Sequence, residues 1–68
     1  MPKKPAVRVN RNIWGNHICY LGREKVEMYG GLFDAKFWLA SKIKAGHPVA
    51  KSSMIGAEEV KDMMRYVE

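Results

Sequence analysis

Basic and aromatic side chains share a stretch of 22 residues in the first half of the chain. They are Arg8, Arg11, Trp14, Tyr20, Arg23, Lys25 and Tyr29, with Asn10 among them. Lysine and arginine neutralise phosphates, arginine can read a guanine edge through two hydrogen bonds, and aromatic rings stack on bases. The pattern favours a nucleic-acid-binding surface, although Trp14 and Tyr20 would equally suit a small hydrophobic core.

Residues able to support catalysis or to bind a metal ion are few. Cys19 has only His17 near it on the same strand face, and His47 is remote in the sequence. A structural zinc site takes four ligands, and a cysteine nucleophile needs a base that a third group orients. Gly30-Gly31 lacks the lysine and the spaced glycines of a phosphate-binding loop. We therefore expect no enzyme activity, no metal and no cofactor.

Charge is spread unevenly along the chain, whose net charge is +5. Residues 1–25 hold six basic side chains and one acidic side chain, whereas residues 47–68 carry one net negative charge. The positive field is concentrated where the basic and aromatic side chains lie. This distribution favours a polyanionic partner over a general contribution to solubility.

The length of 68 residues allows one domain with a thin core. A hydrophobic fraction of 47% argues against disorder, and no apolar run is long enough to cross a membrane. No apolar segment follows residues 1–5, so we expect a flexible basic arm there rather than a secretory signal, and a single domain over 6–68. The lone Cys19 cannot form an intramolecular disulfide, which fits a cytoplasmic protein.

Alternation of polar and apolar side chains predicts three strands. Residues 7–10 alternate between valine and polar side chains, 14–21 form a longer segment of mixed character, and 25–29 alternate again. The mixed segment leaves open which of its faces is buried. Gly22 suits the second turn because glycine adopts positive φ at low cost. Three consecutive strands with short turns predict an antiparallel sheet.

Helical periodicity follows the strands. Asp34 is a suitable N-cap for a helix over 35–45, and Gly46 is a suitable end. The apolar stripe of this helix should lie across the sheet, and it consists of Ala35, Trp38, Leu39 and Ile43. Phe37 points away from the stripe, so we expect a second element to cover it.

A second amphipathic helix is expected over 57–67, with Gly56 as its N-cap and Glu59 three residues later. The predicted fold class is α+β, with a three-stranded antiparallel sheet packed on one helix and an additional C-terminal helix. Burial of Val7, Val9, Val26 and Met28 under the first helix would turn their neighbours outward. The exposed sheet face should then carry Arg8, Asn10, Lys25, Glu27 and Tyr29.

Part of this pattern resembles the AP2-type DNA-binding domain and the related arm-binding domains of tyrosine integrases. The resemblance covers Val7 to Ile43, roughly half the chain, and rests on Val7-Arg8, Trp14-Gly15-Asn16, Ile18, Gly31-Leu32-Phe33, Ala35 and Ala40. It implies a three-stranded sheet on one helix that binds duplex DNA. It also implies DNA contacts by Arg8 and Trp14, and less directly by Arg11.

We therefore expect a small DNA-binding accessory or regulatory protein of the phage or mobile-element type. An alternative is a protein-interaction module, such as a phage inhibitor of a host nucleoprotein complex, which docks through Met63 and Met64. A third hypothesis is a protein that binds single-stranded nucleic acid or double-stranded RNA, because stacking aromatics on a sheet also suit unpaired bases. The target site and the oligomeric state do not follow from the sequence.

Overall fold

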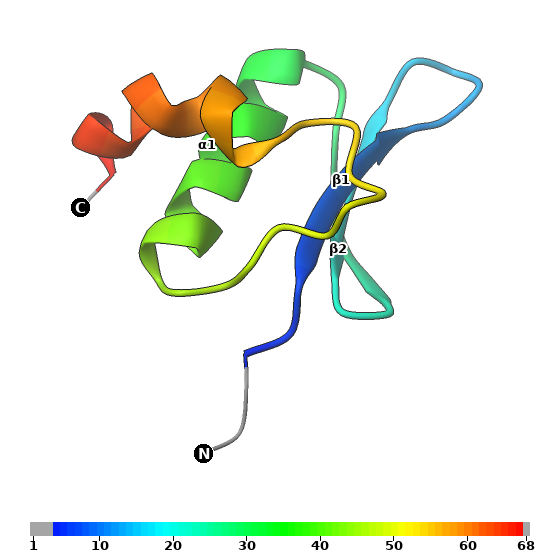
Figure 1. The fold of residues 1–68 in the computed structure, drawn as a ribbon. Coiled ribbons are helices and arrows are strands. Elements are labelled where there is room, and N and C mark those ends of the chain that lie inside the picture. Colours follow the sequence, from blue (N-terminus) through cyan, green and yellow to red (C-terminus); the bar gives the residue numbers. More distant parts are fainter. Residues whose placement is uncertain (1–3, 68) are drawn as a thin grey trace.

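The chain forms a three-stranded sheet, an α-helix and a C-terminal 3₁₀-helix. The computed structural model describes residues 4–67, with the elements β1 (Val7–Arg11), β2 (His17–Leu21), β3 (Glu24–Tyr29), α1 (Leu32–Lys44) and η1 (Ala57–Tyr66). The sheet is antiparallel in the order β1-β2-β3. Figure 1 shows α1 against one face of the sheet, and η1 packs on α1 rather than on the strands. The predicted α+β class and architecture are confirmed.

The core lies between β1, β2 and α1. Val7, Val9 and Cys19 are fully buried on the helix side of the sheet, and they meet Leu39 and its neighbours on α1. Alternation along β1 therefore places its valines inward, as predicted. The complete set of buried apolar side chains is Val7, Val9, Cys19, Ala35, Trp38, Leu39, Ala40, Ile55, Val60 and Val67.

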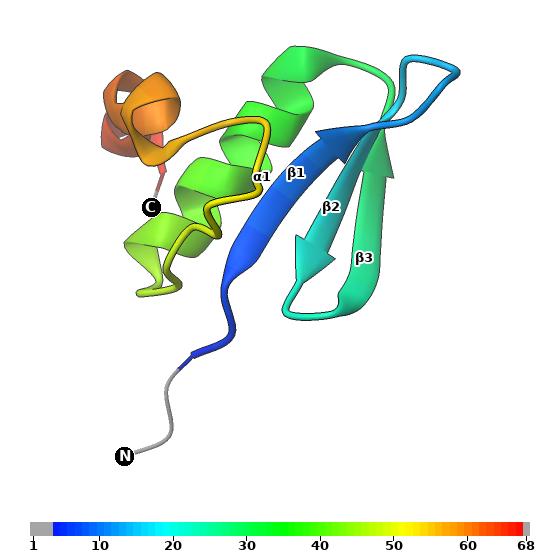
Figure 2. The ribbon, with the colours of Figure 1, turned by 45° about the vertical axis from the view of Figure 1, so that its right-hand side comes forward.

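The outer edge of β1 is covered by the segment that follows α1. Val7 donates to the Pro48 carbonyl at 2.8 Å, and Ala50 donates back to the Val7 carbonyl at 2.9 Å. Further along, the amide of Val9 donates to Ser53 Oγ at 3.1 Å. Figure 2 shows this segment beside β1, on the side away from β2. An exposed strand edge is a site for unwanted pairing, and here the protein's own backbone occupies it.

β3 has the opposite orientation to the predicted one. Tyr29 pairs with His17, so it lies on the helix side, whereas Met28 pairs with Ile18 and faces away from the helix. Val26 and Met28 are 38% and 52% exposed rather than buried. The prediction for these residues was wrong because the pairing with β2 turns Glu27 and Tyr29, rather than Val26 and Met28, toward α1, and an edge strand does not have to turn its apolar side chains inward.

A β-bulge complicates the same strand. The pairing moves from Cys19–Glu27 to Tyr20–Lys25, which leaves Val26 as an extra residue. Lys25 consequently lies opposite Tyr20 and faces outward, as predicted. Tyr29, which was predicted on the same face, lies on the helix side. Glu27 lies opposite the buried Cys19, and therefore faces the helix side.

α1 begins three residues earlier than predicted. Its N-cap is Gly31 and Asp34 lies in the first turn, where a carboxylate is favourable beside the helix dipole. Gly46 has φ of +102° just beyond the helix end, in agreement with its predicted role. Phe37 stays 39% exposed, so it is only partly covered.

η1 packs on α1 through a mixed apolar face. Its first turn is capped as predicted by a hydrogen bond from the Gly56 amide to Glu59 Oε2 at 2.8 Å. Val60 and Val67 are buried, and Met63 and Met64 pack half-buried against the core. Lys44 Nζ donates to the Val67 carbonyl and joins the ends of the two helices. The two methionines therefore contribute to packing and do not form a free docking stripe.

The start of the domain contacts the loop after α1. Residues 1–3 of the predicted basic arm lie outside the described residues. Among the described residues, Lys4 Nζ donates to the Ala45 carbonyl, and His47 Nδ1 lies 3.0 Å from the Pro5 carbonyl. The last two residues of the predicted arm are thus held against the body of the domain.

His17 and Cys19 are core residues in this structure. His17 is 6% exposed, and its Nδ1 has no hydrogen-bond partner among the described residues. Burial, with a smaller contribution from the Glu27 carboxylate, raises the pKa of the Cys19 thiol to about 11. A thiol with such a pKa stays protonated at neutral pH, whereas a nucleophile needs the thiolate. In residues 4–67 no three His, Cys, Asp or Glu side chains gather as a metal site would require.

The two tryptophans give a matched test of the core. Trp38 is 9% exposed and Trp14 is 78% exposed. We expect Trp38→Ala to lower the free energy of unfolding by about 3–5 kcal/mol, since a buried aromatic side chain is lost. Trp14→Ala should change it by no more than about 0.5 kcal/mol. Urea denaturation followed by circular dichroism measures both, and equal losses would contradict the described burial.

The Cys19 thiol predicts a loss of stability at alkaline pH. Its pKa is about 11 when folded against 9.0 for the ordinary group, so the folded state holds the proton more tightly. The stabilisation is complete below pH 9 and is lost as the pH rises through 11. We expect this to contribute on the order of 1–3 kcal/mol. Urea denaturation from pH 8 to 11 should show a steeper fall for the wild type than for Cys19→Ala, and parallel curves would contradict the burial of the thiol.

Candidate nucleic-acid interface

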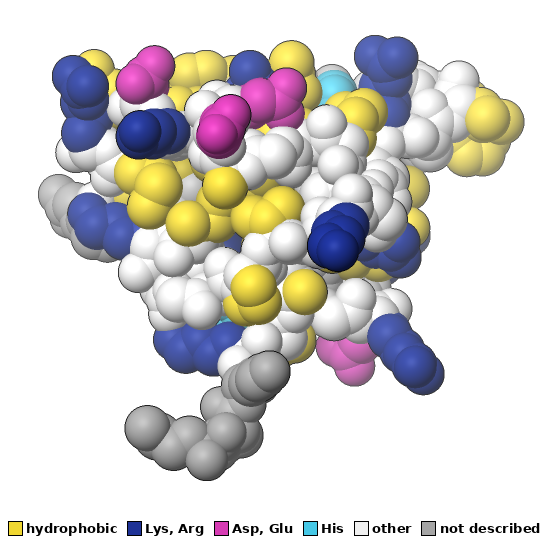
Figure 3. Space-filling model, in the orientation of Figure 1, with side chains coloured by type: hydrophobic (Ala, Val, Ile, Leu, Met, Phe, Trp, Pro, Cys, Tyr) yellow, Lys and Arg dark blue, Asp and Glu magenta, His cyan; other side chains and the backbone are white. Residues whose placement is uncertain are grey.

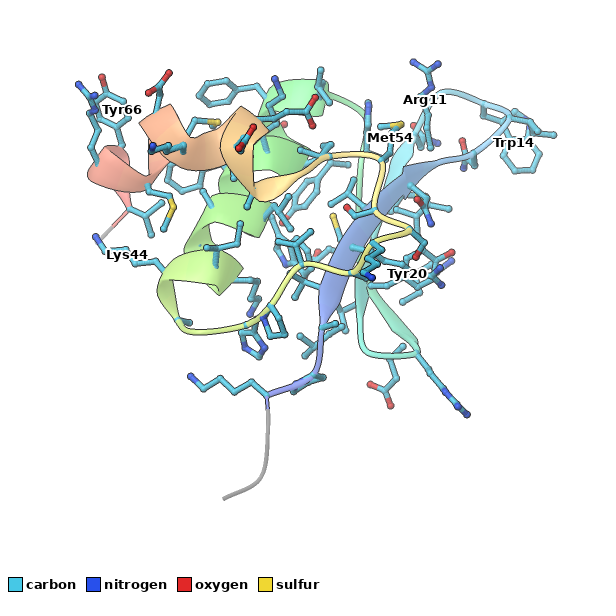
Figure 4. The ribbon with its side chains drawn as sticks, in the orientation of Figure 1. Arg11, Trp14, Tyr20, Lys44, Met54 and Tyr66 are labelled. Carbon is cyan, nitrogen blue, oxygen red and sulfur yellow. The ribbon has the colours of Figure 1, made fainter. Side chains whose placement is uncertain are left out.

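The sheet face turned away from α1 carries four of the eight predicted site residues. By strand pairing and alternation this outer face consists of Arg8, Asn10, Ile18, Tyr20, Lys25, Val26 and Met28. Figure 4 shows Tyr20 on this side of the sheet. Apolar side chains occupy its middle, and a row of polar and cationic groups crosses it near the β2–β3 turn.

That row contains an arginine stacked on an aromatic ring. Arg8 pairs with Tyr20 across β1 and β2, and its Cζ lies 4.2 Å from the centroid of the Tyr20 ring. Lys25 pairs with Tyr20 from the other side, and Arg23 is exposed in the adjoining turn. Stacking over a ring holds the guanidinium plane in place and leaves its N–H groups available to an acceptor. Two cations thus flank Tyr20 in one row, and a third lies in the turn that joins β2 to β3.

At the other end of the sheet, the β1–β2 loop presents apolar side chains to solvent. Residues 12–16, called the loop tip here, include Ile13 and Trp14, which are 89% and 78% exposed. Asn12 Oδ1 accepts hydrogen bonds from the amides of Trp14 at 3.0 Å and Asn16 at 2.9 Å. Figure 4 shows Trp14 at the far end of the loop. The loop tip therefore holds a defined turn without using its large side chains in the core.

The position of Trp14 differs from the predicted one. The residue was expected within the second strand, but β2 begins at His17. The reason is the turn itself, because the Asn12 side chain binds two amides and Gly15 adopts a φ of +83°. Exposed Arg11 lies at the end of β1 next to this turn. Figure 4 shows Arg11 and Trp14 at the same end of the molecule.

Tyr29 does not belong to the outer face. It is half-buried on the helix side, where it packs against the core and lines a cleft with Trp38. Burial raises the pKa of its hydroxyl, and the neighbouring charges of Glu27, Cys19 and Asp34 raise it further. The predicted placement of Tyr29 on the exposed sheet face is therefore wrong, by one residue of strand register.

Two exposed residues near this surface were not predicted from the sequence. Ile13 lies beside Trp14 at the loop tip, and exposed Lys51 belongs to the segment that covers the edge of β1. When the oxygen and nitrogen of the Asn10 amide are exchanged, the nitrogen can donate a hydrogen bond to the Ser52 carbonyl in that segment, at 3.2 Å. Asn12 and Gly15 were the signal for the exposed turn, whereas nothing local to Lys51 indicates its position beside β1.

Acidic side chains lie mainly elsewhere on the molecule. Figure 3 shows them gathered over η1, where Glu58, Glu59 and Asp62 are exposed. Basic side chains lie beside these acidic ones as well as near the sheet, and the loop tip projects as an apolar extension.

None of the helices in the described part of the chain has the length and apolar character needed to cross a bilayer. No protein-family model matches the chain, and the comparisons with curated proteins and with solved structures found no match either.

Proposed function

We propose that the protein binds duplex DNA through the outer face and the loop tip. In this proposal it is a non-enzymatic accessory or regulatory protein of the kind that phages and mobile elements encode, and it acts in the cytoplasm. The observation that carries the proposal is the stacking of Arg8 on Tyr20 at 4.2 Å, with Lys25 in the same row. A fixed guanidinium flanked by a second cation suits both a guanine edge and the phosphates beside it.

The antiparallel form of the sheet suits duplex DNA. A small antiparallel β-ribbon fits the major groove of B-DNA, whose base edges present a readable pattern of donors and acceptors. In this proposal Arg8 and Lys25 enter the groove, and the exposed cations at the ends and the covered edge of the sheet, which are Arg11, Arg23 and Lys51, would be available to the phosphates.

The loop tip adds a second type of contact. Apolar side chains that project from a DNA-binding surface pack on sugars or insert at a base step. Ile13 and Trp14 are suited to this role because the Asn12 hydrogen bonds order the turn before binding. An ordered loop loses less conformational entropy on binding than a mobile one.

The salt dependence of binding tests the proposal at the level of ligand class. If four or five phosphates are neutralised, log K for a duplex should fall with log salt concentration at a slope of roughly −4. Fluorescence anisotropy with duplex DNA, single-stranded DNA and RNA of matched length measures this, and the duplex should bind most tightly. A flat response, or no binding at low salt, would contradict the proposal.

A pair of arginine substitutions tests the location of the surface. Arg8→Ala removes the stacked guanidinium and should weaken duplex binding by about 1–3 kcal/mol if Arg8 contacts a base. The matched control is Arg65→Ala, which removes the same charge from exposed η1 among acidic residues and should leave affinity nearly unchanged. Equal effects of the two substitutions would show that only net charge matters.

A further inference from the structure

A cleft of about 520 Å³ lies beside α1 on the helix side of the sheet. Its walls come from the end of β3 and from α1, and its lining residues are Tyr29, Phe33, Asp34, Phe37, Trp38, Ser41 and Lys42. This volume is in the range of ligand sites in proteins. The cleft uses none of the residues of the outer face.

The cleft lies where the end of β3 meets α1. Glu27 and Tyr29 occupy the helix-side positions of β3, and a carboxylate there cannot complete an apolar core. Phe33 consequently remains 70% exposed and Phe37 39% exposed. Large aromatic side chains gathered at the surface of a small domain mark an interaction site more often than isolated ones do.

One end of the cleft is acidic, although the chain as a whole is basic. Asp34 lines the cleft from the first turn of α1. Glu27 lies two residues from Tyr29 on the same side of β3. Both carboxylates lie near enough to the Tyr29 hydroxyl to raise its pKa. The Tyr29 end of the cleft therefore combines aromatic rings with negative charge.

The other end of the cleft already contains a cation. Lys42 Nζ lies 5.9 Å from the centroid of the Trp38 ring, within the range of a cation–π contact. Lys42 belongs to the chain itself and lies one turn of helix beyond Trp38. Phe33 precedes Asp34 in the first turn of α1, and Asp34 is near enough to the Tyr29 hydroxyl to raise its pKa, so these three residues belong to the end of the cleft away from Lys42. That end remains for a cation from outside.

The chemistry of that end favours a guanidinium group over other ligands. At the end away from Lys42 a phosphate would meet the carboxylate of Asp34, with Glu27 nearby, and a purely apolar ligand would leave these carboxylates unused. A guanidinium plane stacks on aromatic rings and pairs with a carboxylate through two N–H groups at once. The outer edge of β3 has no strand beside it within the described residues, so an extended peptide has backbone partners next to the cleft.

We propose that the cleft binds an arginine side chain of a partner protein, stacked on Tyr29 and Phe33 and paired with Asp34. The arginine is carried by an extended segment that runs along β3. This site is separate from the DNA surface, so the protein can hold DNA with one side of the sheet and a protein with the other. The DNA-binding proposal and the arginine-binding proposal rest on different residues, so each can be tested without the other.

The test uses two peptides of the same shape and different charge. Acetyl-Gly-Arg-Gly-amide and the same peptide with citrulline in place of arginine are titrated into ¹⁵N-labelled protein, and amide shifts are followed by NMR. The arginine peptide should shift the amides of residues 27–38 in a saturable way, with an affinity about threefold or more above that of the citrulline peptide. Equal shifts from both peptides would overturn the proposal.

Substitutions then place the site. Asp34→Asn should weaken the arginine peptide by about threefold without changing citrulline binding, and Phe33→Ala should weaken both. Both side chains are exposed, so the fold should persist, as the dispersion of the spectrum shows. The control Glu58→Gln removes a similar charge from η1 and should change nothing. If Glu58→Gln has the same effect as Asp34→Asn, or if oligothymidylate shifts the cleft resonances more strongly than the arginine peptide, the proposed ligand is wrong.

Discussion

The hydrogen bonding of β1 on both of its edges is the constraint on which the rest of the structure depends. One edge pairs with β2, and the other is held by Pro48, Ala50 and Ser53 from the segment after α1. Because this segment must reach β1, it fixes where α1 ends and where η1 begins. It also buries the valines of β1 and leaves β3 as the one open edge among the described residues.

This constraint separates what the sequence could predict from what it could not. The valines of β1, the stripe of α1 and the cap of η1 follow from local periodicity, and each is where its pattern places it. The orientation of β3 depends instead on its pairing with β2 and on the bulge at Val26. Neither is local, and the mixed character of β2 gave no hydrophobic face from which to set the register.

The candidate surface shows the same division. Arg8 and Asn10 were placed correctly because they alternate with buried valines, whereas Tyr29 was misplaced together with its strand. Lys25 faces outward only because the bulge reverses the alternation between it and Met28. The exposure of Trp14 depends on the side chain of Asn12, which satisfies two amides and so ends the strand early. A tryptophan in a turn cannot be told from a core tryptophan by its type alone.

β3 forms the boundary between two surfaces of opposite character. Lys25 lies with Tyr20 and Arg8 on the outer face, while Glu27 and Tyr29 face the helix side beside Asp34. Successive side chains of a strand point to opposite faces, so cations can collect on one side and carboxylates on the other without cancelling each other. In the two proposals, the outer face would take a polyanion and the Asp34 end of the cleft would take a guanidinium group. The charges of Arg8 and Lys25 thus lie on one side of a three-stranded sheet, and those of Glu27 and Asp34 lie on the other.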